Sequence, residues 1–235
     1  MVIETILFDL DDTLVAEMEW ARGGWHLVAA HLAAAVERDG ADLERMMSGF
    51  FARDRRRVFN QLADTLGLDS DALHECIAIY RHSPRPLTLL PDAAAALEFA
   101  ADRRTGIVTD GDVVTQSTKV ECAGLASSVE VIVYTGALGA DHSKPSPSGF
   151  LEALRQLRTA PDTAIYVADN AAKDFIGPRG LGMRTIQVTR AGGVYAGVQA
   201  PAGGEPDAVV SSLLELASVV AAWEHELARG PAAGP

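Results

Sequence analysis

The sequence predicts an α/β fold, in which a doubly wound parallel sheet forms the core and a small all-helical subdomain is inserted. Two patterns and the chain length support this prediction. From residue 89 onward, short apolar runs alternate with helical periodicity, which is typical of strand–helix–strand units. The segment 15–88 shows helical periodicity without a strand pattern. The length of 235 residues allows one sizeable core and one smaller partner.

The first apolar run, residues 6–8, leads into a cluster of acids. Asp9, Asp11 and Asp12 follow it, and Thr13 comes next. Strands of a parallel sheet are buried on both faces, and ligands bind beyond their carboxyl ends. Residues two apart in an extended chain point to the same side, so Asp9 and Asp11 are expected to face one point. Two neighbouring carboxylates repel each other, and a bound divalent cation relieves that repulsion.

Further apolar runs predict the rest of the sheet. They are residues 105–109, 129–134, 164–168 and 183–188, with a short edge strand at 207–210. The run that ends at Thr109 places a hydroxyl at a strand end, where it can hydrogen-bond an anionic oxygen. The backbone N–H groups of Asp110 and Gly111 can add further donors. A threonine at a strand end also serves as a simple cap, and this alternative stays open.

Two later positions add a cation and more acids. Lys144 comes just before Ser146 and Pro147, which suit the N-cap and the first residue of a helix. Lys144 therefore lies near the anion-attracting end of that helix, although a surface lysine is the alternative. Asp169 directly follows a predicted strand, and Asp174 comes shortly after it.

The inserted segment, residues 15–88, is predicted to be a set of amphipathic helices. Residues 17–37 carry apolar side chains at three- and four-residue spacing, which predicts the first of them. Prolines end the helical stretch, because proline cannot continue a helix and favours an extended chain. The connections near 14–17 and 84–89 suit hinges of a moving lid, and a fixed helical pack is the alternative.

Composition and charge exclude several classes of function. The net charge of -12 argues against nucleic acid as a partner, since phosphate backbones require a basic face. The apolar runs fall far short of the ~20 residues that span a bilayer, so no membrane partner is expected. The start lacks the basic residue of a secretory signal, and we expect a cytoplasmic protein. Cys76 and Cys122 lack the spacing of a disulfide framework or a zinc site.

Taken in chain order, these strand-end motifs resemble those of the haloacid dehalogenase-like (HAD) hydrolase superfamily. The first motif reads Asp-x-Asp-x-Thr from Asp9, and the third reads Lys-Pro-x-Pro from Lys144. In the fourth, Ala168 stands where glycine is common. The resemblance implies a Rossmann-like core at 1–14 and 89–229 and a helical cap at 15–88. The glycines and prolines of residues 230–235 predict a flexible tail.

The resemblance also implies a chemistry: a magnesium-dependent phosphatase that acts on a small phosphorylated metabolite, such as a sugar phosphate, a nucleotide or a biosynthetic intermediate. Asp9 would be the nucleophile that forms an aspartyl phosphate, and Asp11 the acid and base. Mg²⁺ would be bound by Asp9, by Asp169 and by the backbone carbonyl of Asp11. The resemblance assigns phosphate binding to Thr109, Asp110, Gly111 and Lys144, and a supporting role to Asp174, Thr13 and Asn170.

Two alternatives to a phosphatase remain at this point. Haloacid dehalogenases release halide and lack both the acid at the position of Asp11 and the metal, so dehalogenation is not expected. A phosphomutase, which returns the phosphoryl group to its substrate, is the alternative enzyme. A catalytically idle binding module that keeps the fold is the alternative from another class. The sequence does not identify the substrate, and it leaves monomer and homodimer equally open.

Overall fold

The computed structural model describes residues 2–229, and the chain divides into two compact units. One unit combines the chain up to Ala16 with the chain from Thr88 onward, and the other spans Glu17–Leu87. The insertion expected at residues 15–88 lies close to this division. The predicted tail at 230–235 lies outside the described residues.

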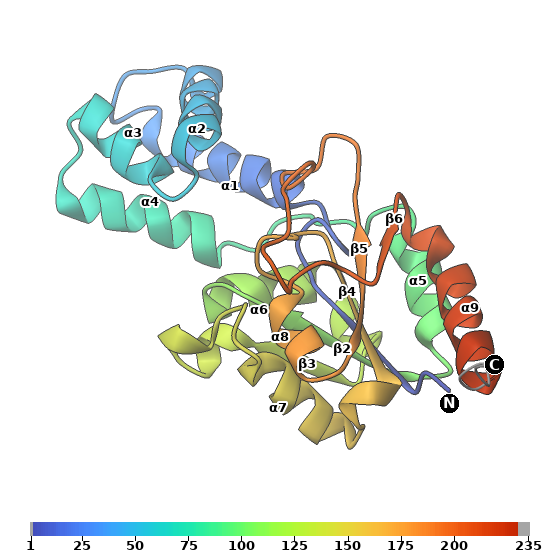
Figure 1. Ribbon diagram of the computed structural model, residues 1–235. Coiled ribbons are helices and arrows are strands. Elements are labelled where there is room, and N and C mark those ends of the chain that lie inside the picture. Colours follow the sequence, from blue (N-terminus) through green and yellow to red (C-terminus); the bar gives the residue numbers. More distant parts are fainter. Residues whose placement is uncertain (1, 230–235) are drawn as a thin grey trace. The chain divides into compact units, whose positions relative to one another are not determined.

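The first unit is built on a parallel sheet with the strand order β3-β2-β1-β4-β5-β6 (Figure 1). Its strands are β1 (Thr5–Phe8), β2 (Arg104–Thr109), β3 (Val131–Tyr134), β4 (Ala164–Ala168), β5 (Arg184–Val188) and β6 (Ala208–Val210). The chain moves outward from β1 in one direction through β2 and β3, and in the other through β4, β5 and β6. The topological switch point therefore lies between β1 and β4, where open α/β sheets form a crevice. The predicted parallel α/β core is confirmed.

Helices cover both faces of this sheet. They are α5 (Ala93–Ala100), α6 (Val113–Cys122), α7 (Ser148–Leu157), α8 (Ile176–Gly180) and α9 (Leu216–Arg229). Figure 1 shows α5 and α9 side by side on one face and α7 and α8 on the other. Phe150 and Leu154 of α7 belong to one buried cluster with Leu7, Val108 and Tyr166 of the sheet. The strands read as continuous apolar runs because both faces of the sheet are buried.

Short 3₁₀ turns complete this unit, and one helix begins later than the sequence predicts. The turns lie at Leu125–Ser127, Thr135–Ala137, Ala140–His142, Pro161–Thr163 and Leu213–Glu215. Helix α7 begins at Ser148, so Pro147 is not its first residue and Ser146 is not its N-cap. The backbone N–H of Ser146 donates to the Ser143 carbonyl at 3.0 Å, which makes residues 143–146 a turn of their own.

The second unit, Glu17–Leu87, is helical throughout its regular structure. Its helices are α1 (Glu17–Leu32), α2 (Gly40–Asp54), α3 (Val58–Leu66) and α4 (Ser70–His82). Trp25 of α1 and Leu43 of α2 are part of a buried cluster to which all four helices contribute. The side chains of Asp39 and Asp69 cap α2 and α4 by accepting backbone N–H groups. This unit therefore has a core of its own.

Helix α1 ends earlier than its apolar pattern. The periodicity predicted a helix to Glu37, but regular helix stops at Leu32 and residues 33–37 form a turn. Glu37 has a φ of 50°, a left-handed conformation that a right-handed helix cannot contain. Among the residues that the structure describes, no helix combines the length and the apolar character needed to cross a bilayer.

The two connections to the insertion pair with each other inside the α/β unit. The backbone N–H of Leu90 donates to the Leu14 carbonyl at 2.8 Å. Val15 and Leu89 form an isolated antiparallel bridge beside it. The insertion therefore leaves the core and returns to it at one point.

Candidate active site

Three buried aspartates converge at the switch point of the sheet. Asp9 follows β1, Asp169 follows β4, and Asp174 lies in the loop before α8. One carboxylate oxygen of each lies within 4.8 Å of the others. The backbone N–H of Asp9 donates to the Val167 carbonyl at 2.9 Å, which continues the pairing of β1 with β4. The parallel pairing of these two strands therefore brings together acids that are far apart in the chain.

Lys144 lies among these acids. Its Nζ lies 2.6 Å from Asp9 Oδ1 and 2.8 Å from Asp174 Oδ1, and it donates to the Tyr166 hydroxyl at 2.8 Å. The Tyr166 hydroxyl in turn donates to the Val108 carbonyl at 3.3 Å. The Lys144 side chain is completely buried, so neighbouring acids compensate its charge in place of water.

One lysine does not compensate this group of acids. Burial raises the pKa of Asp9 to about 6, in spite of the opposing effect of Lys144. Burial, and then the charges of Asp9 and Asp174, raise the pKa of Asp169 to about 9. Burial lowers the pKa of Lys144, but Asp174 and Asp9 outweigh burial and hold that pKa well above its usual range. The site therefore favours additional positive charge.

The residues present fit a hard divalent cation. Carboxylate oxygens are the ligands that Mg²⁺ prefers, and an excess of buried negative charge favours its binding. Asp174 is engaged on both oxygens, with Lys144 at 2.8 Å and with the backbone N–H of Asn170 at 3.0 Å. Asp9 and Asp169 are therefore the candidate side-chain ligands, and Asp174 orients Lys144.

Asp11 contacts a separate set of residues on α6. Its two carboxylate oxygens lie 2.7 and 2.8 Å from Lys119 Nζ, and Gln116 Nε2 donates to it at 3.0 Å. Gln116 Nε2 also donates to Thr109 Oγ1 at 2.6 Å. Burial raises the pKa of Asp11, but Lys119 and these hydrogen bonds outweigh burial and hold that pKa below its usual range. Gln116 therefore links the Asp11 carboxylate to the Thr109 hydroxyl through two hydrogen bonds.

Asp110 connects three loops at the same edge of the sheet. Its Oδ1 accepts from Thr135 Oγ1 at 2.8 Å and from the Lys144 backbone N–H at 3.1 Å. Its Oδ2 accepts from Lys173 Nζ at 2.6 Å. Burial raises the pKa of Asp110, but the charges of Lys144 and Lys173 outweigh burial and lower it. Gly111 follows with a φ of 127°, a conformation that glycine adopts readily and other residues rarely do.

The two remaining predicted residues shape the loops around the site. Thr13 is buried, and its carbonyl accepts from Arg190 Nη2 at 3.1 Å. Asn170 Oδ1 accepts from the backbone N–H of Ala172 at 3.1 Å. The backbone N–H of Asn170 donates to Asp174 Oδ2, so Asn170 helps to fix the loop that carries Asp174.

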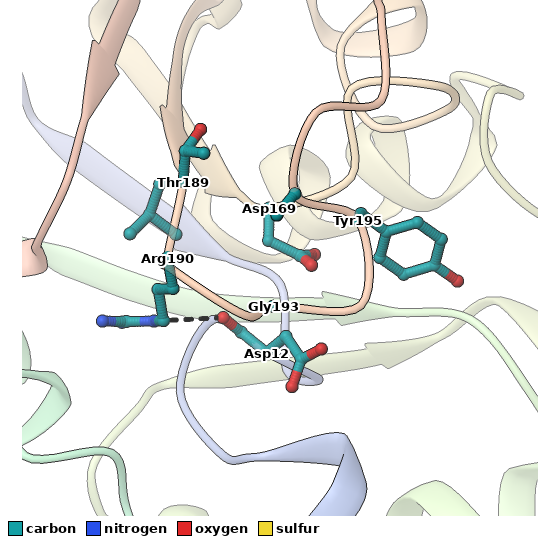
Figure 2. Close-up of a pocket in the computed structure, with 8 residues that line it drawn as sticks. Asp12, Asp169, Thr189, Arg190, Gly193 and Tyr195 are labelled. Carbon is teal, nitrogen blue, oxygen red and sulfur yellow. Dashed lines mark hydrogen bonds between the residues drawn. The ribbon is translucent and has the colours of Figure 1, made fainter. Parts of the chain in front are cut away.

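A small pocket lies beside Asp169 (Figure 2). It measures about 230 Å³, part of it open to solvent, and the loop after β5 contributes Arg190 and Tyr195 to its wall. Figure 2 shows the Asp169 carboxylate directed toward the side on which Tyr195 lies. Arg190 Nε donates to the Asp12 carbonyl at 3.3 Å, and Arg190 Nη1 lies 2.7 Å from Asp92 Oδ2. These contacts hold the loop after β5 beside the acids.

Sequence reasoning missed the partners of the acids, namely Gln116, Lys119 and Lys173. Gln116 and Lys119 are three residues apart on α6, so they share a face. The spacing indicates that the two side chains can bind the same group. Only the position of α6 beside Asp11 shows which group that is. Lys173 directly precedes Asp174, and nothing in its own sequence context separates it from a surface lysine.

Comparison with known proteins yields consistent matches. The family of haloacid dehalogenase-like hydrolases matches residues 3–182. The chain is 27% identical over 200 residues to the glyceraldehyde 3-phosphate phosphatase of Methanopyrus kandleri, which covers 80% of this chain and 85% of that relative. It is 31% identical over 175 residues to the phosphoserine phosphatase of Thermus thermophilus, covering 73% and 68% respectively.

Solved structures agree with the sequence matches. A 2-haloacid dehalogenase from Pseudomonas syringae pv. Tomato superposes with a TM-score of 0.65 at 26% identity, covering 95% of this chain and 100% of that chain. Fold similarity alone does not separate dehalogenases from phosphatases. The match to the family spans most of the chain and includes every motif position predicted from the sequence. This protein therefore belongs to the haloacid dehalogenase-like hydrolase family.

Proposed function

We propose that this enzyme, a phosphoric monoester hydrolase like the two relatives described above, cleaves a small phosphorylated metabolite. Those relatives are named for glyceraldehyde 3-phosphate and phosphoserine, which are both small alkyl phosphates. The observation that carries the proposal is the position of Asp9, whose carboxylate lies at the switch point 2.6 Å from Lys144. A cation at this distance can also neutralise an incoming phosphoryl group, which supports Asp9 as a nucleophile.

The proposed reaction has two steps. In the first, an Asp9 carboxylate oxygen attacks phosphorus, the bond from phosphorus to the leaving oxygen breaks, and Asp11 gives a proton to that oxygen. In the second, water attacks the phosphorus of the aspartyl phosphate and Asp11 takes a proton from that water. Inorganic phosphate leaves, and the Asp9 carboxylate is restored. The lowered pKa of Asp11 favours the carboxylate, which is the form that accepts the proton in the second step. The proton taken up there is the one that Asp11 gives to the leaving oxygen in the first step of the next turnover.

The phosphoryl oxygens would be held by donors from three loops. Gln116 donates to Thr109 Oγ1, and this contact leaves the hydroxyl hydrogen of Thr109 available to donate to an oxygen of the substrate. Lys144 would supply a positive charge. The backbone N–H groups of Asp110 and Gly111 would add donors next to Thr109.

Mg²⁺ is the proposed cofactor, with Asp9, Asp169 and the backbone carbonyl of Asp11 as its protein ligands. Support comes from the raised pKa of Asp9 and Asp169, because both carboxylates lack sufficient positive charge nearby. When bound, the ion would supply charge that reduces the repulsion between a carboxylate nucleophile and a phosphoryl group.

The helical unit Glu17–Leu87 is the proposed cap. Two features support this role: the unit has its own core, and its two connections are hydrogen-bonded together between Leu14 and Leu90. A lid attached at one point can exclude water in the first step and admit it in the second.

The test of the proposed function is phosphate release from a panel of phosphoserine, glyceraldehyde 3-phosphate, sugar phosphates and nucleotides. Each compound is assayed with and without Mg²⁺, using the wild type, Asp9→Asn and Asp162→Asn. Asp162 is an exposed residue in the turn before β4, so its replacement controls for the change of charge. We expect magnesium-dependent release that falls on the order of 10³-fold or more in Asp9→Asn alone. Full activity of Asp9→Asn would overturn the proposed nucleophile.

A further inference from the structure

Every lysine of this chain lies at the active-site edge of the sheet. Only three of the 20 basic residues are lysines, and each one pairs with a different acid. Lys144 pairs with Asp9, and Lys173 pairs with Asp110. The third, Lys119, reaches Asp11 from α6.

Lys119 is buried and contacts both carboxylate oxygens of Asp11. Its Nζ lies 2.7 and 2.8 Å from the two oxygens of Asp11, and only 6% of its side chain is exposed. Gln116, one turn earlier on the same helix, is also buried and donates both to Asp11 and to Thr109. One helix therefore holds a carboxylate at the end of β1 and a hydroxyl at the end of β2 in a single hydrogen-bonded chain.

Backbone hydrogen bonds that do not involve Lys119 hold the loop that carries Asp11. The backbone N–H groups of Leu14 and Val15 donate to the Leu10 carbonyl at 2.9 and 3.1 Å, and Asp12 donates to the Val15 carbonyl at 2.7 Å. Burying a lysine carries a desolvation cost, which an apolar residue at this position would avoid. The backbone hydrogen bonds fix the loop but not the Asp11 side chain. The contacts with Lys119 fix the orientation of that side chain.

We propose that Lys119 is a positioning residue that aims the Asp11 carboxylate at the leaving oxygen, with Gln116 fixing that carboxylate relative to Thr109. This inference rests on the proposed function, in which Asp11 protonates the leaving group. A carboxylate held on both oxygens keeps one orientation, and proton transfer depends steeply on the position of the donor.

The experiment compares two kinds of phosphoester. An alkyl phosphate needs a proton on its leaving oxygen, whereas p-nitrophenyl phosphate releases a stabilised phenolate that departs without one. The alkyl ester is the compound of the phosphate-release panel that the wild type cleaves fastest. kcat and KM are measured for the wild type, Lys119→Met, Lys119→Arg and Arg155→Met. Arg155 pairs with Glu152 on the surface of α7, so its variant removes a positive charge away from the site.

We expect Lys119→Met to lower kcat for the alkyl ester by about 10²-fold or more and for the aryl ester by less than about tenfold, with little change in either KM. Lys119→Arg should restore part of the alkyl activity, and Arg155→Met should leave both activities unchanged. Equal losses on the two esters, or no loss, would overturn the inference. If Lys119→Met does not fold, Gln116→Leu is measured in its place. It must lower kcat for the alkyl ester more than kcat for the aryl ester. A wild type that cleaves neither p-nitrophenyl phosphate nor any compound of the phosphate-release panel would instead overturn the proposed function itself.

Discussion

At the scale of single residues, the site consists of buried charges whose states depend on one another. Lys144 touches Asp9 and Asp174 and is completely buried, whereas the side chain of Lys173 is 33% exposed beside Asp110. Water screens an exposed pair strongly and a buried pair weakly. The two lysines should therefore differ in their contributions to stability, although each makes an ion pair of 2.6 Å.

This difference gives a prediction for two matched variants. Lys144→Met should lower the free energy of unfolding by about 3 to 5 kcal/mol, because it leaves two carboxylates buried without their cation. Lys173→Met should lower it by about 1 kcal/mol or less. Urea unfolding without divalent ions, followed by circular dichroism, measures both values. Equal losses in the two variants would contradict this account of the site.

At the scale of elements, helix α8 packs closely against the loop that delivers Lys144. A Cβ atom at Gly177 would lie 2.8 Å from the Pro145 carbonyl oxygen and 3.2 Å from that of Ser146. A Cβ atom at Gly180, on the same helix, would meet no atom within 4 Å. Gly177 thus allows a contact between helix and backbone that any larger residue would push apart.

The helix itself supplies the matched control for this contact. Gly177→Ala should lower the free energy of unfolding by about 1 to 3 kcal/mol, because the loop backbone must move to admit the methyl group. It should also lower kcat, since the same loop carries Lys144. Gly180→Ala should be neutral or stabilising by up to about 1 kcal/mol. Thermal unfolding and phosphate release of the two variants test this, and equal behaviour would contradict it.

At the scale of the whole molecule, the excess of acid at the site makes stability depend on pH. The pKa values of Asp9 and Asp169 are raised to about 6 and about 9, from an ordinary value of 3.8. Between the ordinary and the raised values, the folded state binds more protons than the unfolded state, so stability falls as pH rises. Asp11 and Asp110 have lowered pKa values, and their contributions are lost only in more acidic solution.

The metal-free protein should therefore lose thermal stability steadily between about pH 5 and about pH 9. Mg²⁺ should raise the unfolding temperature most at the alkaline end, where the ion replaces the missing protons. Melting curves in EDTA and in Mg²⁺ across this range provide the measurement. Asp169→Asn should flatten the dependence in EDTA. An unfolding temperature of the wild type that rises with pH in EDTA would refute the assignment.

Several features of this protein were determined by its sequence alone. The apolar runs predicted the parallel sheet because strands covered on both faces contain few polar residues, and β4 begins and ends where its run does. The strand-end motifs predicted Asp9, Lys144 and Asp169 because the carboxyl ends of parallel strands share one edge. Local periodicity could not set the end of α1, since the apolar pattern continues to Val36 whereas regular helix stops at Leu32.

Only the tertiary structure decided which residues meet. The order β2-β1-β4 places Asp9 beside Asp169, whereas the sequence predicts parallel neighbours without giving their order. The packing of α6 places Lys119 on Asp11, and no local pattern could select that partner among the acids of the chain. Periodicity is set by neighbouring residues, while the pairing of charges depends on contacts between residues distant in sequence. The sequence therefore determined the acids, and the fold decided which cation holds each one.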